Sequence, residues 1–118
     1  MIAKVFLFAA ITAAGSTAAA AEGIGGRYSV TGTLADGMKY SISAEIMMKS
    51  ETTCDIKWSD GTEGVCMLHG TTLSVASITH GKPQVGVYQV APDGSIEGEF
   101  IDNFHGKGIS REKLTPVP

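Results

Sequence analysis

Few residues in this sequence have the spacing that catalysis or metal binding requires. The histidines, His69, His80 and His105, are far apart, and none has a partner at metal-ligand spacing. Glu97 and Glu99 are two residues apart on the predicted outer face of a strand, whereas paired catalytic carboxylates face each other across a cleft. No G-x-S-x-G nucleophile motif is present. We therefore expect no catalytic residue, no metal ligand and no cofactor, and predict that the protein is not an enzyme.

Cys54 and Cys66 are the two residues to which the sequence assigns a covalent role. An even number of cysteines in an exported protein favours a disulfide. Their spacing is too wide for a redox C-x-x-C pair, and two cysteines alone rarely complete the four ligands of a structural zinc site. Two buried free thiols are the alternative.

The first residues have the pattern of a secretory signal peptide. Lys4 precedes an apolar stretch from Val5 to about Ala14, and the alanine run 18–21 offers a cleavage site. We predict a signal peptide over residues 1–21, one domain over 22–118, and export to the periplasm or the medium. The apolar stretch is shorter than the roughly 20 residues that span a bilayer, so we expect no membrane span in the mature chain.

The net charge excludes one class of partner. The formal net charge is −3, and removal of Lys4 with the signal peptide makes the mature chain more acidic. Non-specific nucleic-acid binding requires a basic surface that displaces counterions. We therefore expect no nucleic-acid partner.

The elements that would position any site are strands, because apolar and polar residues alternate with period two along most of the mature chain. This alternation is typical of strands with one buried and one solvated face. It is clearest in residues 27–32, 39–48, 53–58, 72–75 and 95–100.

Three Asp-Gly pairs separate alternating runs, at Asp36-Gly37, Asp60-Gly61 and Asp93-Gly94. Opposed residues in a hairpin must share a face, and three-residue loops ending in each glycine meet this condition. The resulting register is specific. It places Gly32 opposite Tyr40, Cys54 opposite Cys66, and Tyr88 opposite Gly98.

The other connections are assigned from shorter signals. His69-Gly70 predicts a two-residue loop with Leu68 opposite Thr71, and residues 80–83 read as the next loop. The glycine-rich segment 23–26 is interpreted as a flexible lead-in, and the last strand is expected within residues 103–114.

Seven or eight short antiparallel strands with short turns must hide their edges, and closure into a barrel does so fully. We therefore predict an all-β fold, a single meander closing into a small up-and-down barrel of lipocalin or avidin plan, with a sandwich as the alternative. Most inward-facing side chains would pack as core. The alternative for Tyr40, Trp58 and Tyr88 is that they line a small ligand cavity.

The longest predicted loops are the first candidates for binding, because rigid scaffolds usually carry function on loops. These are residues 80–84 and 102–107. Their candidate binding residues are His80, Lys82, Gln84, Asp102, Asn103, His105 and Lys107.

Several strings of the mature sequence resemble a family of small exported proteins of Gram-negative bacteria of the rhizobial group, often labelled fibronectin-binding. They are residues 26–32, 93–98 and 114–116, with Tyr40 and Trp58 between them. The family usually has Trp where Phe100 stands and Gly near Ile42. The resemblance implies a binding role and brings no catalytic residues.

We therefore expect an exported, non-enzymatic binding module, adhesin-like, with a protein partner at the cell envelope or outside it. Two alternatives remain open. One is a small-ligand carrier that uses the barrel mouth, and the other is an exported inhibitor of a protease or lysozyme.

Overall fold

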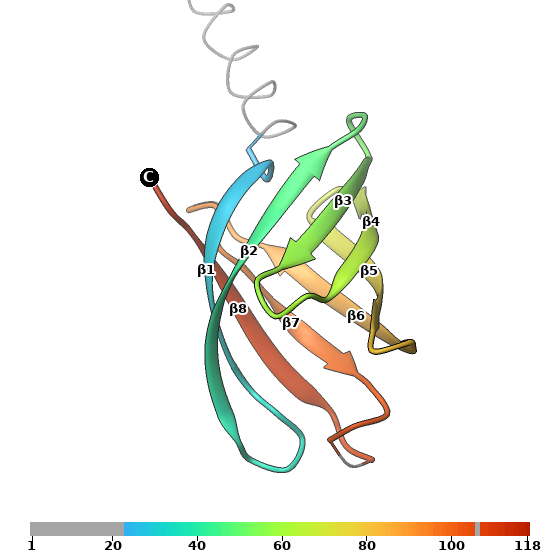
Figure 1. The fold of residues 1–118 in the computed structure, drawn as a ribbon. Coiled ribbons are helices and arrows are strands. Elements are labelled where there is room, and N and C mark those ends of the chain that lie inside the picture. The colour runs from blue at the N-terminus through green and yellow to red at the C-terminus, as the bar shows by residue number, and fades with distance from the viewer. Residues whose placement is uncertain (1–22, 106) are drawn as a thin grey trace, which may run out of the picture.

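Eight antiparallel strands close into a barrel in the computed structural model, which describes residues 23–105 and 107–118 (Figure 1). Each strand pairs with the next along the chain, and β1 pairs with β8. This confirms the predicted up-and-down barrel and excludes the alternative, a sandwich. The predicted signal peptide lies outside the described residues. The strands are β1 Gly26–Thr33, β2 Lys39–Met48, β3 Thr53–Trp58, β4 Glu63–His69, β5 Thr72–Thr79, β6 Lys82–Val90, β7 Ile96–Ile101 and β8 Ser110–Pro116.

The three Asp-Gly hairpins have the predicted loop length. In the first, the Gly37 N–H donates to the Leu34 carbonyl at 2.8 Å, and Gly37 has a φ of 93°. The Asp36 carboxylate accepts the Met38 N–H at 3.0 Å, which holds the turn. The other two hairpins repeat this pattern, and all three predicted cross-strand pairs are confirmed.

Two connections differ from the prediction. The β4–β5 turn is Gly70-Thr71, so Leu68 lies opposite Leu73 rather than Thr71. The register is shifted by two residues, which leaves each side chain on its predicted face.

The predicted loop 80–83 is a two-residue turn, His80-Gly81, in which both residues have positive φ, as in type I′ hairpins. The expectation of a long binding loop over 80–84 is therefore wrong. Lys82 and Gln84 belong to β6, because pairing with β5 continues to the turn itself.

One end of the barrel, here called the closed end, is filled by apolar side chains. It lies where β1 begins, beside the β2–β3, β4–β5 and β6–β7 connections (Figure 1). Ile24 is buried there, and its carbonyl accepts the Tyr28 hydroxyl at 2.6 Å. The interpretation of residues 23–26 as a flexible lead-in is thus wrong, because Ile24 packs into the core. Burial raises the pKa of Tyr28 to about 12.

The disulfide is confirmed. Cys54 on β3 and Cys66 on β4 are bonded, with Cα atoms 5.0 Å apart, and both side chains are buried. The bond joins two strands that already pair, and it faces the apolar core between Ile56 and Leu68.

Candidate functional site

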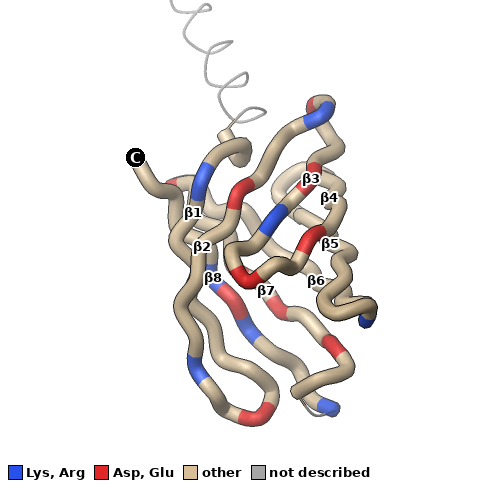
Figure 2. The backbone as a smooth tube through the Cα atoms, viewed as in Figure 1, with Lys and Arg blue, Asp and Glu red and all other residues tan. Residues whose placement is uncertain are grey.

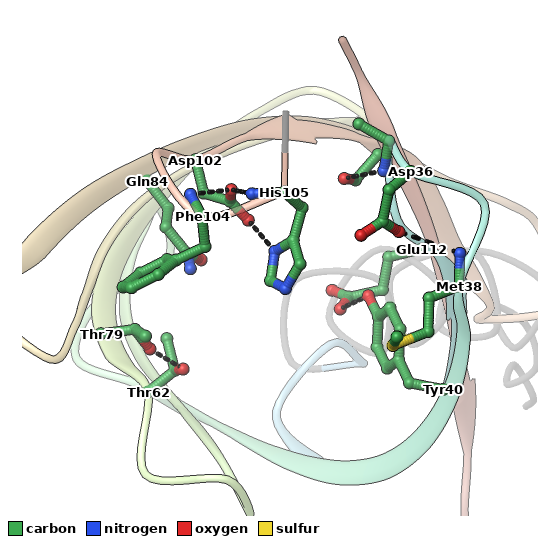
Figure 3. Close-up of polar contacts among 12 residues, drawn as sticks. Asp36, Met38, Tyr40, Thr62, Thr79, Gln84, Asp102, Phe104, His105 and Glu112 are labelled. Atoms are coloured by element: carbon green, nitrogen blue, oxygen red, sulfur yellow. Dashed lines mark hydrogen bonds and ion pairs between the residues drawn. The ribbon is translucent and has the colours of Figure 1, made fainter. Parts of the chain in front are cut away.

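The opposite end of the barrel interior, here called the open end, is polar. The connections β1–β2, β3–β4, β5–β6 and β7–β8 surround it. Figure 3 shows polar side chains from these connections and from the strands beside them along the barrel wall at this end. Buried polar side chains on the inner wall are Thr62, Ser77, Ser110 and Glu112. The same strands that carry core residues at the closed end therefore carry hydrogen-bonding groups at the open end.

Five residues form one row across five neighbouring strands of this wall. Tyr40 on β2 lies opposite Gly32 on β1, which lies opposite Glu112 on β8. Glu112 in turn lies opposite Gly98 on β7, which lies opposite Tyr88 on β6. Since the glycines have no side chains, the two tyrosine rings extend over them toward Glu112. A Cβ at either glycine would collide with the tyrosine beside it.

Both tyrosines bind the central carboxylate. The Tyr40 hydroxyl donates to Glu112 Oε2 at 2.5 Å, and the Tyr88 hydroxyl donates to Oε1 at 3.0 Å. Burial raises the pKa of Glu112, and it outweighs the hydrogen bonds from the tyrosines, which lower it. Burial and the nearby Glu112 charge also raise the pKa values of Tyr40 and Tyr88, so both remain donors at neutral pH.

Trp58 lies beside this carboxylate. Its indole faces Glu112 and contributes to lowering the pKa of Glu112, yet Nε1 is buried and makes no hydrogen bond of normal geometry to any described residue. A cavity of about 20 Å³ lies between Trp58, Glu112, Tyr88, Ser77 and Gln84. That volume is sufficient for one water molecule or one group of similar size.

Asp102 and His105 stand at the rim of the open end (Figure 3). The Asp102 side chain is only 3% exposed and accepts the backbone N–H groups of Phe104 and His105 and the His105 ring at 3.1 Å. Burial raises the pKa of Asp102, but these hydrogen bonds together outweigh it, and the net shift is downward. The start of the β7–β8 connection is thereby held in a compact turn.

The two predicted binding segments meet at the rim. The centroids of the Phe104 and His80 rings lie 6.1 Å apart, and Lys82 Nζ lies 5.5 Å from the centroid of the Phe104 ring. Gln84 lies deeper, where Ser77 donates to its Oε1 at 3.3 Å. Asn103 and Lys107 are exposed and lie outside this cluster. The structure brings together Tyr40, Trp58 and Tyr88, the predicted cavity residues, around Glu112.

Glu112 was not predicted as a site residue, although the alternation of inward and outward positions could have placed it. Ser110 and Leu114 have the same parity as Glu112, so all three face inward. Arg111 and Lys113 flank it, and Figure 2 shows the resulting basic, acidic and basic positions along β8. Both cations lie on the outer face, where Arg111 binds Glu99 at 2.6 Å. They leave Glu112 without an ion pair among the described residues.

The described residues contain no group of three or more His, Cys, Asp or Glu side chains arranged to hold a metal ion. Within residues 23–105 and 107–118, no helix has the length and apolar character needed to cross a membrane.

Comparison with known proteins identifies the fold. No protein-family model and no curated protein matches the sequence. Among solved structures, a redesigned β-barrel aligns with a TM-score of 0.71 at 19% identity, covering 84% of this chain and 96% of its own. The redesigned barrel mFAP1, solved bound to DFHBI, aligns at 0.69 and 18%, covering 81% and 97%. A mutant of the fluorescent protein UnaG aligns at 0.52 and 13%, covering 82% and 98%.

Proposed function

We propose that this protein is an exported, non-enzymatic barrel that binds a small organic ligand through its open end. The observation that carries the proposal is Glu112, a carboxylate buried in the barrel wall without an ion pair among the described residues. Burying such a group without a charged partner is costly, and a packed apolar side chain would stabilise the barrel more simply.

The surroundings of Glu112 fit ligand binding. Ligand sites combine apolar and aromatic walls with a few placed polar groups. Here Tyr40, Tyr88 and Trp58 supply the aromatic walls, and Ser77 and Gln84 supply further polar atoms. The barrel mFAP1, similar in fold, was solved with DFHBI bound. The disulfide favours an oxidising compartment, in agreement with the predicted export.

Native mass spectrometry can test this proposal. The full chain would be expressed with its own N-terminal segment in a Gram-negative host, recovered from the periplasm and exposed to a mixed metabolite and lipid extract. We expect a bound small molecule, released when Glu112→Leu removes the carboxylate and retained in Glu97→Gln, a variant of the outer face. If no adduct forms with any extract, or if Glu112→Leu folds and retains it, the proposal fails.

A second candidate function, binding of a protein partner, is favoured by an exposed apolar row on the outer face. The row contains Val65 on β4, Ala76 on β5, Val85 on β6 and Ile101 on β7, and each residue lies opposite the next one on the neighbouring strand. Val65 is 54% exposed, and Val85 and Ile101 are each 50% exposed. Contiguous exposed apolar surface of this kind often marks a protein interface.

The resemblance to proteins labelled fibronectin-binding makes fibronectin the first partner to test. We expect wild-type protein to bind immobilised fibronectin and Val85→Lys to lose that binding. Thr31→Lys, on the outer face of β1 away from the row, is the control. Equal binding by Val85→Lys and wild type, or no binding by either, would remove this candidate.

A further inference from the structure

We propose that the cavity between Trp58 and Glu112 is a subsite for a hydroxyl group, and that the ligand is an alcohol or phenol. This inference rests on the proposed ligand-binding function and names the chemical group that the site recognises.

The cavity presents a hydrogen-bond donor, the Trp58 N–H, which faces Glu112 without making a hydrogen bond of normal geometry to it. Trp58 is 8% exposed, and its Nε1 atom is buried without a partner among the described residues. An indole N–H can only donate, and a buried donor without an acceptor is destabilising. The group that enters this cavity should therefore bring an oxygen that accepts from Trp58.

The cavity also presents acceptors. Each oxygen of Glu112 receives one tyrosine hydroxyl, and a carboxylate oxygen can accept a further hydrogen bond. The incoming group should therefore also donate. A hydroxyl does both, because its oxygen accepts from Trp58 while its hydrogen is donated to Glu112.

Other ligand groups fit less well. A primary ammonium would pair with the charge of Glu112, but it has three donors and no acceptor, so it would leave the Trp58 N–H unpaired. A ligand carboxylate would bring a second negative charge beside Glu112, and like charges at this distance repel. An ether oxygen would accept from Trp58 but would donate nothing to Glu112.

The size of the cavity limits what enters it. About 20 Å³ accommodates one non-hydrogen atom, the size of a hydroxyl oxygen or a water molecule. A water molecule there would be displaced by the ligand hydroxyl, which reproduces the same hydrogen bonds. The body of the ligand would have to displace the Ser77 and Gln84 side chains, which line the cavity on the side of the open end.

The single tryptophan provides a direct readout. Because Trp58 is the only tryptophan in the chain, the indole ¹⁵N–¹H spectrum contains one tryptophan resonance. The full chain, recovered after export, would be titrated with 1-hexanol, its isomer 1-methoxypentane, and hexylamine. We expect 1-hexanol to shift the indole resonance saturably. The ether should bind at least about tenfold more weakly, a difference of about 1.4 kcal/mol, because it cannot donate to Glu112.

Calorimetry on variants tests which protein atoms distinguish 1-hexanol from the other two probes. Trp58→Phe should reduce the preference for 1-hexanol over hexylamine, because only the alcohol can accept from the indole N–H, and Glu97→Gln should preserve that preference. Binding of hexylamine or the ether as tightly as 1-hexanol would overturn the hydroxyl assignment while the ligand-binding function stands. An indole resonance unchanged by all three probes would also overturn it. The proposed function itself fails only if the extract experiment yields no adduct that depends on Glu112.

Discussion

The Tyr88 hydroxyl reaches Glu112 Oε1 at 3.0 Å, although a whole strand separates the strands that carry them. The residue between them is Gly98, which has no side chain to block the ring. Tyr40 reaches the same carboxylate from the other side over Gly32. The inner wall of the open end is thus organised around one acidic residue, with an aromatic ring lying over a glycine on each side.

The two glycines of this row should tolerate substitution differently. A Cβ at Gly98 would lie 2.6 Å from Tyr88 Cα and collide with the Val87 carbonyl, so backbone would have to move. The three atoms nearest to a Cβ at Gly32 all belong to the Tyr40 ring and hydroxyl, the far end of a side chain that can rotate. We expect Gly98→Ala to reduce the free energy of unfolding by about 2–3 kcal/mol and Gly32→Ala by about 1 kcal/mol in urea titrations.

A double-mutant cycle separates the two cases. In a Tyr40→Ala background the cost of Gly32→Ala should disappear, whereas the cost of Gly98→Ala should persist in Tyr88→Ala. If Gly32→Ala costs as much in the Tyr40→Ala background as in the wild type, the Tyr40 ring does not lie over Gly32.

Stability should depend on pH through Glu112. Burial raises the pKa of this carboxyl above its ordinary 4.5, so the folded chain binds the proton more tightly than the unfolded chain. The contribution of Glu112 to the free energy of unfolding should therefore be largest below pH 4.5 and fall as pH rises through the folded pKa, by about 1.4 kcal/mol for each unit between the two pKa values. Glu112→Gln should remove this decline.

Denaturant titrations at several pH values measure the effect, with Glu97→Gln as the matched control on the exposed outer face. A wild-type protein whose pH dependence equals that of Glu112→Gln would show that the pKa of Glu112 is the same in the folded and unfolded chains.

The disulfide should leave no free thiol and make a moderate contribution to stability. Cys54 and Cys66 close a short loop, for which the chain-entropy relation gives about 2–3 kcal/mol. Thiol counting on denatured, unreduced protein should find no free thiol. Reduction, or Cys54→Ala combined with Cys66→Ala, should lower the free energy of unfolding by that amount; two titratable thiols in the unreduced protein would contradict the pairing.

The Trp58 ring should contribute more to the free energy of unfolding than the Trp58 N–H group does. Trp58→Ala should cost about 3–5 kcal/mol, because the ring is buried against the core. Trp58→Phe fills most of the space and removes a buried donor without a partner, so its cost should be clearly smaller. Thermal unfolding of both variants compares them, and similar losses would mean that the indole N–H is satisfied in the folded protein.

The hairpins could be predicted because their determinants are local. An Asp-Gly pair marks a hairpin turn, and the period of two then selects the three-residue loop and assigns every following side chain to a face. That reasoning correctly placed Gly32 opposite Tyr40 and Tyr88 opposite Gly98. The predicted loop was wrong at His80, because His80 and Gly81 form a two-residue turn and the pairing of β5 with β6 continues up to that turn.

Alternation and turn residues were enough to predict the strands, most of their registers, the disulfide partners and most inward-facing side chains, because each depends on residues close along the chain or on the alternation of faces. The meeting of Tyr40, Tyr88 and Trp58 at Glu112 follows only from the closed barrel. Their strands are distant in sequence and become neighbours only when β1 pairs with β8 and the sheet curves into a barrel. The curvature of all eight strands together determines which wall positions face one another across the closed sheet. It also determines which buried hydrogen-bond donor is left without an acceptor.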